Sequence, residues 1–154
     1  MASMGYAVPV AVGVAFASPD SQVICICGDG GFHMATQSLM LIAQYGLKVS
    51  VVVLNNEALG MITQFQSLYF GGNMAGTPSE GGYLVPDIGC IAAAYKIPFR
   101  KVMVEGEVKA DLFNGPSLIE VNTGGLTTVV PKLEYNKSLA DMTPAWPLTE
   151  ESRK

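Results

Sequence analysis

The fold is decided by residues 22–56, which read QVICICGDGGFHMATQSLMLIAQYGLKVSVVVLNN. Residues 22–27 and 48–54 are near-continuous apolar runs rich in β-branched side chains, as expected of strands buried on both faces. Residues 32–45 between them carry apolar side chains at helical intervals, and Gly46 is placed to end that helix. Two strands joined by a helix run parallel with a right-handed crossover. This stretch therefore predicts a βαβ unit.

The rest of the chain continues the alternation of helices and strands. A helix is expected before the unit, at 5–17. The elements expected after it are a helix at 61–69, a Gly-rich loop at 71–86, a helix at 87–95, a strand at 99–104, a short helix within 105–114 and a strand at 117–122. We predict an α/β fold, an open and mostly parallel sheet with helices on both faces, over residues 1–130. Residues 131–154, polar and punctuated by proline, are expected to form a C-terminal tail.

Composition narrows the classes of function. The chain has 154 residues, of which 49% are hydrophobic and 14% charged, so it is not a disordered protein. Its net charge is −4 and it has no basic cluster, so we expect neither nucleic acid nor an anionic membrane as a partner. It lacks a transmembrane-length apolar run and a basic leader, which favours the cytoplasm. Its cysteines, Cys25, Cys27 and Cys90, are expected to be buried thiols rather than a metal or redox site.

Polar residues follow both strands of the βαβ unit. Asp29 comes directly after the first strand, and Asn55 and Asn56 come after the second. The carboxyl ends of parallel strands meet at one edge of a sheet, where ligands bind, so these oxygens can converge. A carboxylate and an amide oxygen suit Mg²⁺ if a diphosphate completes its shell, and Gly30 and Gly31 would let backbone N–H groups reach that diphosphate. The alternative is a tight strand–helix turn with an Asp cap and an Asn turn.

Longer motifs extend this pattern. Residues 28–30 (GDG), followed after a spacer by Asn55-Asn56, resemble the thiamine-diphosphate signature. Residues 54–72 (LNNEALGMITQFQSLYFGG) resemble a characteristic stretch of the acetolactate synthase (acetohydroxyacid synthase) family, as do 2–13 and 115–121. The resemblance runs from residue 2 to about residue 131. It implies the thiamine-diphosphate-binding fold.

The resemblance also implies roles for individual residues. Mg²⁺ would be held by the side chains of Asp29 and Asn56 and by the backbone carbonyl of Ala58. The implied cofactor-binding residues are Ser3, Met4, Gly28, Gly30, Gly31, Asn56, Leu59, Gly60 and Met61. Among them, Met4 would lie against the aminopyrimidine ring, and Met61 would approach both cofactor and substrate. Packing in the core is the alternative role for each of these side chains.

Two aromatic residues near these motifs, Phe65 and His33, are further candidates for a role in the site. Phe65 stands where acetolactate synthases carry a Trp, so the resemblance places it in the substrate channel and leaves the choice of acceptor open. An alternative role for Phe65 is core packing. His33 is the only histidine and lies four residues after Asp29. A histidine there could act as a base, but the corresponding family position is usually not His, and we do not assign it to catalysis.

The implied activity is that of a Mg²⁺-dependent carboligase, an acetolactate-synthase-like transferase or lyase. It would decarboxylate a 2-keto acid, pyruvate in the first instance, and add the two-carbon unit to a carbonyl acceptor. One alternative is a 2-keto-acid decarboxylase of the sulfopyruvate or phosphonopyruvate type. Another is a non-enzymatic nucleotide-binding module, although the chain lacks the GxGxxG fingerprint of such domains.

The resemblance implies that part of the active site lies elsewhere. The family's general acid/base is a Glu in an N-terminal pyrimidine-binding domain, which these residues do not contain, so no catalytic residue is assigned here. The chain also begins at the MG motif, without the opening strand and helix of the family's domain. We expect a C-terminal fragment or one half of a split enzyme, inactive alone. Its pyrimidine-binding domain would belong to the same parent chain or to a separate subunit, within a homodimer or tetramer.

Overall fold

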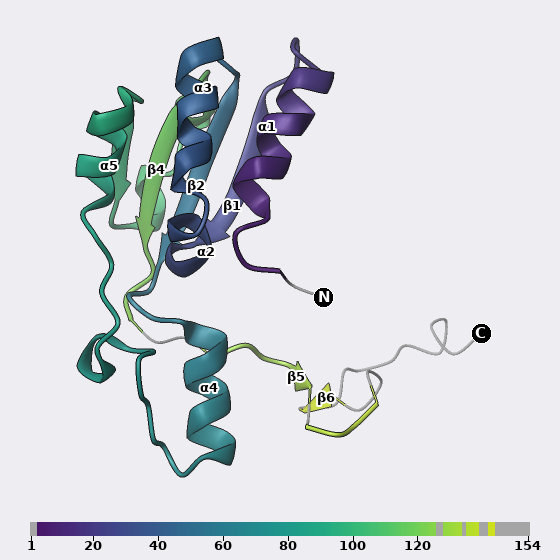
Figure 1. The fold of residues 1–154 in the computed structure, drawn as a ribbon, viewed down its shortest axis with the longest axis vertical. Helices are drawn as coiled ribbons and strands as arrows, with labels where there is room; N and C mark the ends of the chain where they lie inside the picture. Colours follow the sequence, from purple (N-terminus) through teal and green to yellow (C-terminus); the bar gives the residue numbers. More distant parts are fainter. Residues whose placement is uncertain (1–2, 126–127, 134, 139–141, 144–154) are drawn as a thin grey trace.

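A parallel four-stranded sheet forms the centre of the computed structural model, which describes residues 3–125, 128–133, 135–138 and 142–143 (Figure 1). Its strands are β1 (Val23–Gly28), β2 (Val49–Asn55), β3 (Phe99–Val102) and β4 (Ser117–Asn122). Their order across the sheet is β1-β2-β4-β3, so the last of them in the chain lies between β2 and β3. The predicted α/β class with a parallel sheet is confirmed.

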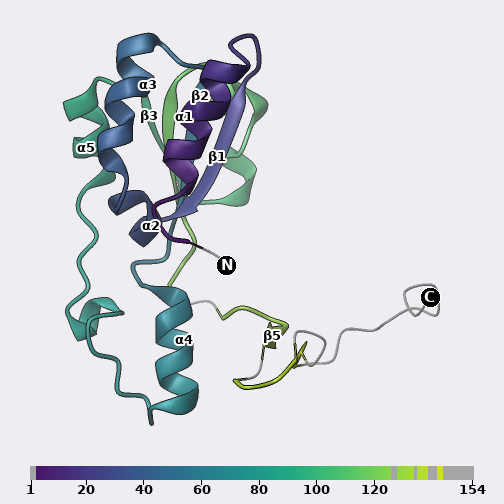
Figure 2. The same ribbon diagram turned by 45° about the vertical axis from the view of Figure 1, so that its right-hand side comes forward.

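Three helices cover one face of this sheet: α1 (Ala7–Ala17), α3 (Leu39–Tyr45) and α5 (Ile88–Tyr95) (Figures 1 and 2). Their apolar side chains meet alternate residues of the strands, because successive strand residues point to opposite faces. The largest buried side chains of this core include Val8, Phe32, Leu39, Ile42, Val51 and Leu118. α5 begins at the cap of Asp87, whose Oδ1 accepts a hydrogen bond from the Cys90 N–H at 2.8 Å.

The opposite face carries a thinner layer. In the described residues it is covered by the 3₁₀ helix η4 (Ala110–Phe113), which packs near a small cluster made by Val52, Val102 and Ile119. A second 3₁₀ helix, η3 (Glu105–Glu107), precedes it. The short helix expected within 105–114 is thus present as two 3₁₀ turns, one of which covers this face. On β1 the side chains of Ile24 and Ile26 are left 51% and 62% exposed.

The helix expected at 32–45 is divided into three pieces. They are α2 (Asp29–His33), η1 (Thr36–Ser38) and α3. The apolar stripe has a five-residue gap after Met34, which is exposed, and the Thr and Ser hydroxyls of η1 are groups that compete with helical hydrogen bonding. The turn expected at 28–31 is correspondingly shorter, because α2 begins at Asp29. Gly46 ends α3 in the left-handed region at φ +59°, as expected.

One further helix, α4 (Gly60–Tyr69), lies beyond the carboxyl ends of the strands, away from the other α-helices (Figures 1 and 2). The loop after it contains the 3₁₀ helix η2 (Ser79–Gly81). Within the expected tail, β5 (Lys132–Leu133) and β6 (Met142–Thr143) form a small antiparallel pair. No helix in the described part of the chain is long and apolar enough to cross a membrane.

The three cysteines differ in exposure: Cys25 is buried, Cys27 half-buried and Cys90 exposed, and all three are free thiols. The expectation of buried thiols therefore holds for Cys25 and is wrong for Cys90. The apolar run that contains Cys25 forms a central part of β1, whereas Cys90 lies in the first turn of α5, on the side away from the core.

Candidate functional site

The site lies where the carboxyl ends of β1, β2 and β4 meet. In the register of the sheet Gly28 is paired with Leu54, and Asn55 is paired with Asn122. This pairing brings the start of α2 next to the loop that follows β2. Burial raises the pKa of the Asp29 carboxyl, and the backbone N–H groups of Gly30, Ala58 and Glu57 lie close enough to oppose that shift in part. The convergence expected from the sequence is therefore present.

A cavity of about 480 Å³ opens at this edge of the sheet. The residues expected to bind the cofactor and metal all line it: Ser3, Met4, Gly28, Asp29, Gly30, Gly31, Asn56, Ala58, Leu59, Gly60 and Met61. Its wall is completed by residues that the sequence did not single out, among them Ile26, Leu54, Ile62 and Thr123. The cavity thus has one polar end, near Asp29, and one largely apolar side.

Asp29 has the features of a ligand for a cation. It is 4% exposed; Oδ1 accepts a hydrogen bond from the Gly30 N–H at 2.8 Å, while Oδ2 is buried with no hydrogen-bond partner among the described residues. Burial raises the pKa of Asp29, and the surrounding N–H groups offset this only in part. A buried carboxylate oxygen without a partner is unfavourable unless another group binds it, so the residue fits a cation such as Mg²⁺.

The loop that follows β2 supplies the other implied ligands. Ala58 is buried, and the Asn56 Oδ1 accepts a hydrogen bond from its N–H at 3.3 Å. Between them Glu57 has a φ of +55°, a left-handed conformation that is uncommon for a residue other than glycine. The Leu59 N–H then bonds to the Thr77 carbonyl at 3.0 Å, which ties the loop to the Gly-rich segment. The loop is therefore held in a single, unusual backbone conformation.

At two positions beside the cavity the backbone packs closely against other residues of the site. A Cβ at Gly30 would lie 2.5 Å from Leu59 Cδ2 and 3.0 Å from Met4 Cε. A Cβ at Gly60 would lie 2.9 Å from Asn56 Nδ2. Any larger residue would displace side chains of the site itself, so the packing of the site requires glycine at both positions.

Sequence reasoning missed one polar group here. Tyr83 lies in the loop after α4, and its hydroxyl is buried with no hydrogen-bond partner among the described residues. The hydroxyl lies 3.2 Å from the point that a Gly30 Cβ would occupy. Burial and the negative charge of Asp29 raise the pKa of Tyr83 to about 12. Nothing in the aperiodic sequence of residues 71–86 could have identified it.

Two residues considered from the sequence lie outside the cavity. Phe65 is on α4, 39% exposed, with its ring 4.7 Å from that of Tyr69 and 5.7 Å from that of Tyr135. The substrate-channel role of Phe65 stays a prediction, because it is not among the lining residues. His33 is exposed at the end of α2 and does not line the cavity either.

The fold and this site define the chain as a cofactor-binding domain of the thiamine pyrophosphate enzymes. Residues 1–121 match the family described as "Thiamine pyrophosphate enzyme, C-terminal TPP binding domain". The chain belongs to this family, and thiamine diphosphate is its cofactor. The resemblance found in the sequence is confirmed.

Comparison with individual proteins shows which members of this family the chain is similar to. The chain is 38% identical over 126 residues to an acetolactate synthase of Arthrospira platensis, with 79% of this chain and 21% of that protein covered. It is 34% identical over 159 residues to a mitochondrial acetolactate synthase catalytic subunit of Aspergillus candidus, with 100% and 22% covered. The chain therefore spans about a fifth of the curated relatives it matches. It is the thiamine-diphosphate-binding domain of an acetolactate-synthase-like protein.

A solved structure shows the same fold. It is the Rhodococcus jostii RHA1 thiamine diphosphate-dependent 4-hydroxybenzoylformate decarboxylase, with a TM-score of 0.61 and 30% sequence identity. The match covers 82% of this chain and 24% of that chain.

Proposed function

We propose that this chain holds Mg²⁺ and the diphosphate end of thiamine diphosphate in an acetolactate-synthase-like carboligase. The observation that carries the proposal is Asp29 Oδ2, which is buried without a hydrogen-bond partner among the described residues and lies near the loop with Asn56 and Ala58. Asp29 and Asn56 would bind the metal through side-chain oxygens and Ala58 through its carbonyl. The backbone of Gly30 and Gly31 would contact the diphosphate, with the Gly31 N–H as the donor because the Gly30 N–H donates to Asp29 Oδ1.

When bound, thiamine diphosphate supplies the electron sink for decarboxylation of a 2-keto acid, here pyruvate. The residues of this chain would bind, orient and shield it. Met4 and Leu59 would place apolar atoms against the cofactor, and Met61, with Ser3, Gly28 and Gly60, would complete the wall. Pyruvate as substrate, a carbonyl acceptor and a cytoplasmic location are parts of this proposal.

The other half of the site would come from a pyrimidine-binding domain, in the same parent chain or in a separate subunit, within a homodimer or tetramer. That domain would supply the Glu that exchanges a proton with the cofactor. Relatives named as a catalytic or large subunit support the existence of partners. We call this chain together with such a domain the assembled enzyme.

Calorimetry on the assembled enzyme tests the metal site. Asp29→Ala should abolish Mg²⁺-dependent binding of thiamine diphosphate. The protein would then offer the metal and its diphosphate only the Asn56 amide and the Ala58 carbonyl, with no negative charge. Asn56→Ala should weaken binding less, since it removes a neutral ligand. Unchanged affinity in Asp29→Ala would reject the assignment.

A second candidate activity is 2-keto-acid decarboxylation without transfer to an acceptor. It is favoured by the structural match to a decarboxylase. Incubating the assembled enzyme with pyruvate plus 2-ketobutyrate separates the two, because a carboligase forms acetohydroxy acids and a decarboxylase forms aldehydes.

A further inference from the structure

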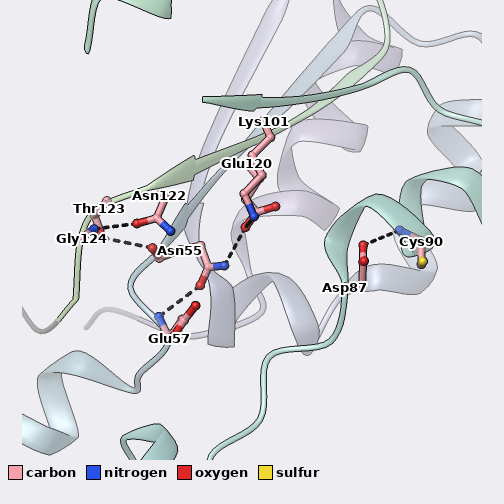
Figure 3. Close-up of polar contacts among 9 residues, drawn as sticks. All are labelled: Asn55, Glu57, Asp87, Cys90, Lys101, Glu120, Asn122, Thr123 and Gly124. Carbon is pink, nitrogen blue, oxygen red and sulfur yellow. Dashed lines mark hydrogen bonds and ion pairs between the residues drawn. The ribbon is translucent and has the colours of Figure 1, made fainter. Parts of the chain in front are cut away.

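The side chain that anchors the loop after β2 is Asn55, which does not line the cofactor cavity. It is 6% exposed, and both ends of its amide are bonded (Figure 3). Nδ2 donates to Glu120 Oε1 at 2.8 Å, and Oδ1 accepts the Glu57 N–H at 3.1 Å. The second bond closes an Asx turn that ends at Glu57, the residue with φ +55°. Asn55 therefore holds the strained backbone between Asn56 and Ala58.

Glu120 is placed by the sheet rather than by the loop. In the register of the sheet, Glu120 of β4 is paired with Val53 of β2 and with Lys101 of β3. Asn55, two residues after Val53, points to the same face, within diagonal reach of the carboxylate. Lys101 Nζ lies 3.1 Å from Oε1, and Glu120 is 5% exposed (Figure 3). A buried carboxylate in a sheet is unfavourable compared with an apolar residue of similar size, so its presence points to a task other than stability.

The chemistry of a carboxylate defines that task. An ionised carboxylate only accepts hydrogen bonds, so it selects the NH₂ end of the Asn55 amide. The amide oxygen must then face the Glu57 N–H. The Asn55 carbonyl is fixed as well, by the Thr123 N–H at 3.0 Å and the Thr123 hydroxyl at 3.2 Å (Figure 3). β4 and the residue after it thus hold Asn55 at both its backbone and its side chain.

We propose that Glu120 is a positioning residue for the metal site: by orienting Asn55, it fixes the loop that presents Asn56 and Ala58 to the cation beside Asp29. Lys101 pairs with the carboxylate on its solvent side. This inference rests on the proposed function. It adds residues of β3 and β4 that touch neither cofactor nor metal.

The test measures Mg²⁺-dependent binding of thiamine diphosphate by calorimetry on the assembled enzyme, together with thermal unfolding. Glu120→Leu removes the acceptor and should weaken binding about tenfold or more, an effect of the size seen when residues that position a metal site are lost. Glu120→Gln keeps an acceptor for Asn55 and should bind within about threefold of wild type, a loss of roughly 0.6 kcal/mol. The loss in Glu120→Leu should shrink as Mg²⁺ is raised.

Ser117→Ala is the matched control. It removes a buried hydrogen bond between the same two strands, from Ser117 Oγ to Ser50 Oγ at 2.9 Å, at the end of the sheet away from the loop. It should lower the unfolding temperature and leave affinity unchanged. If Glu120→Leu binds as wild type does, or if Ser117→Ala loses as much affinity, the positioning role is wrong.

Two further outcomes distinguish a failure of the positioning role from a failure of the proposed function. If Glu120→Leu does not fold, Asn55→Ala is the alternative variant, because it removes the same hydrogen bond from the side of Asn55. A tenfold loss of affinity in Asn55→Ala supports the positioning role, and unchanged affinity overturns it. If wild type itself shows no Mg²⁺-dependent binding, the proposed function fails and the positioning role fails with it. Binding in wild type with no effect of either variant rejects the positioning role alone.

Discussion

Asp29 combines a proposed binding role with a stability penalty. Burial raises its pKa above the ordinary 3.8, so the folded protein holds this proton more tightly than the unfolded chain does. The stability that protonation provides is fully present below pH 3.8 and is lost as pH rises through the raised pKa. Above that pKa the cofactor-free protein carries an uncompensated buried charge, which a bound cation would offset.

Asp29→Asn should therefore stabilise the cofactor-free protein while removing metal-dependent binding. The expected gain at neutral pH is on the order of 1 kcal/mol, or about 2–4 °C in unfolding temperature. The fall in stability as pH rises past the raised pKa should also disappear. Thermal unfolding across that pH range, without cofactor, checks both. A variant that unfolds like wild type at every pH, or that still binds thiamine diphosphate with Mg²⁺, contradicts this account.

Tyr83 offers a second test of a single atom. Its hydroxyl has no hydrogen-bond partner among the described residues, so Tyr83→Phe should not destabilise the cofactor-free protein. If the hydroxyl donates to the bound diphosphate or to the Asp29 carboxylate that holds the metal, affinity should fall about threefold to tenfold, one net hydrogen bond. Calorimetry and thermal unfolding of the same preparation measure the two quantities. Lower stability with unchanged affinity would show a purely structural hydroxyl.

Among the α-helices of the described part of the chain, α4 is the least covered. Only Thr63 of this helix is buried, while Met61, Phe65 and Leu68 are exposed apolar residues. Its outer side meets the segment after β5, where the Tyr135 N–H donates to the Tyr69 hydroxyl at 3.2 Å. Residues of the expected tail thus contact the helix that carries Phe65.

Phe65→Ala should change the ratio of carboligation products more than it changes cofactor affinity, if Phe65 lines the acceptor channel. Tyr135→Ala is the control, because it removes the same aromatic contact, 5.7 Å between ring centroids, from the other side. Product analysis with pyruvate plus 2-ketobutyrate gives the ratio. An unchanged ratio in Phe65→Ala, or an equal change in both variants, would assign Phe65 to packing instead.

Elements and site residues were predictable to different degrees. β1 and β2 were predictable because their apolar runs are nearly continuous. The convergence of Asp29 and Asn56 was predictable because the carboxyl ends of parallel strands meet at one edge. The helix expected at 32–45 is divided because Thr and Ser hydroxyls compete with the backbone hydrogen bonds of a helix. The spacing of apolar residues does not reveal this competition. Glu120 was not assigned, because its contact with Asn55 requires β4 to lie beside β2, and strand order is not encoded in any local pattern.

At the scale of the molecule, the exposed apolar surface sets what the chain can do alone. Ile24 and Ile26 of β1 and Met61 and Phe70 near α4 are more than half exposed, and such patches mark surfaces that other protein covers. We expect the isolated chain to fold marginally and to bind thiamine diphosphate with Mg²⁺ weakly. It should release no CO₂ from pyruvate until a matching pyrimidine-binding domain is added. Turnover by the 154-residue chain alone would contradict the two-part site.

The sheet order β1-β2-β4-β3 also determines when the site can form. β1 and β2 are close in sequence and can pair early, but β3 has no neighbour until β4 enters between it and β2. The bond from Asn55 to Glu120 joins residues 65 positions apart, and such distant contacts form slowly. During synthesis β4 leaves the ribosome after all the other strands of this sheet. We therefore expect the loop beside Asp29 to reach its final geometry only after β4 has joined the sheet, so that the cofactor would bind only chains whose sheet is complete.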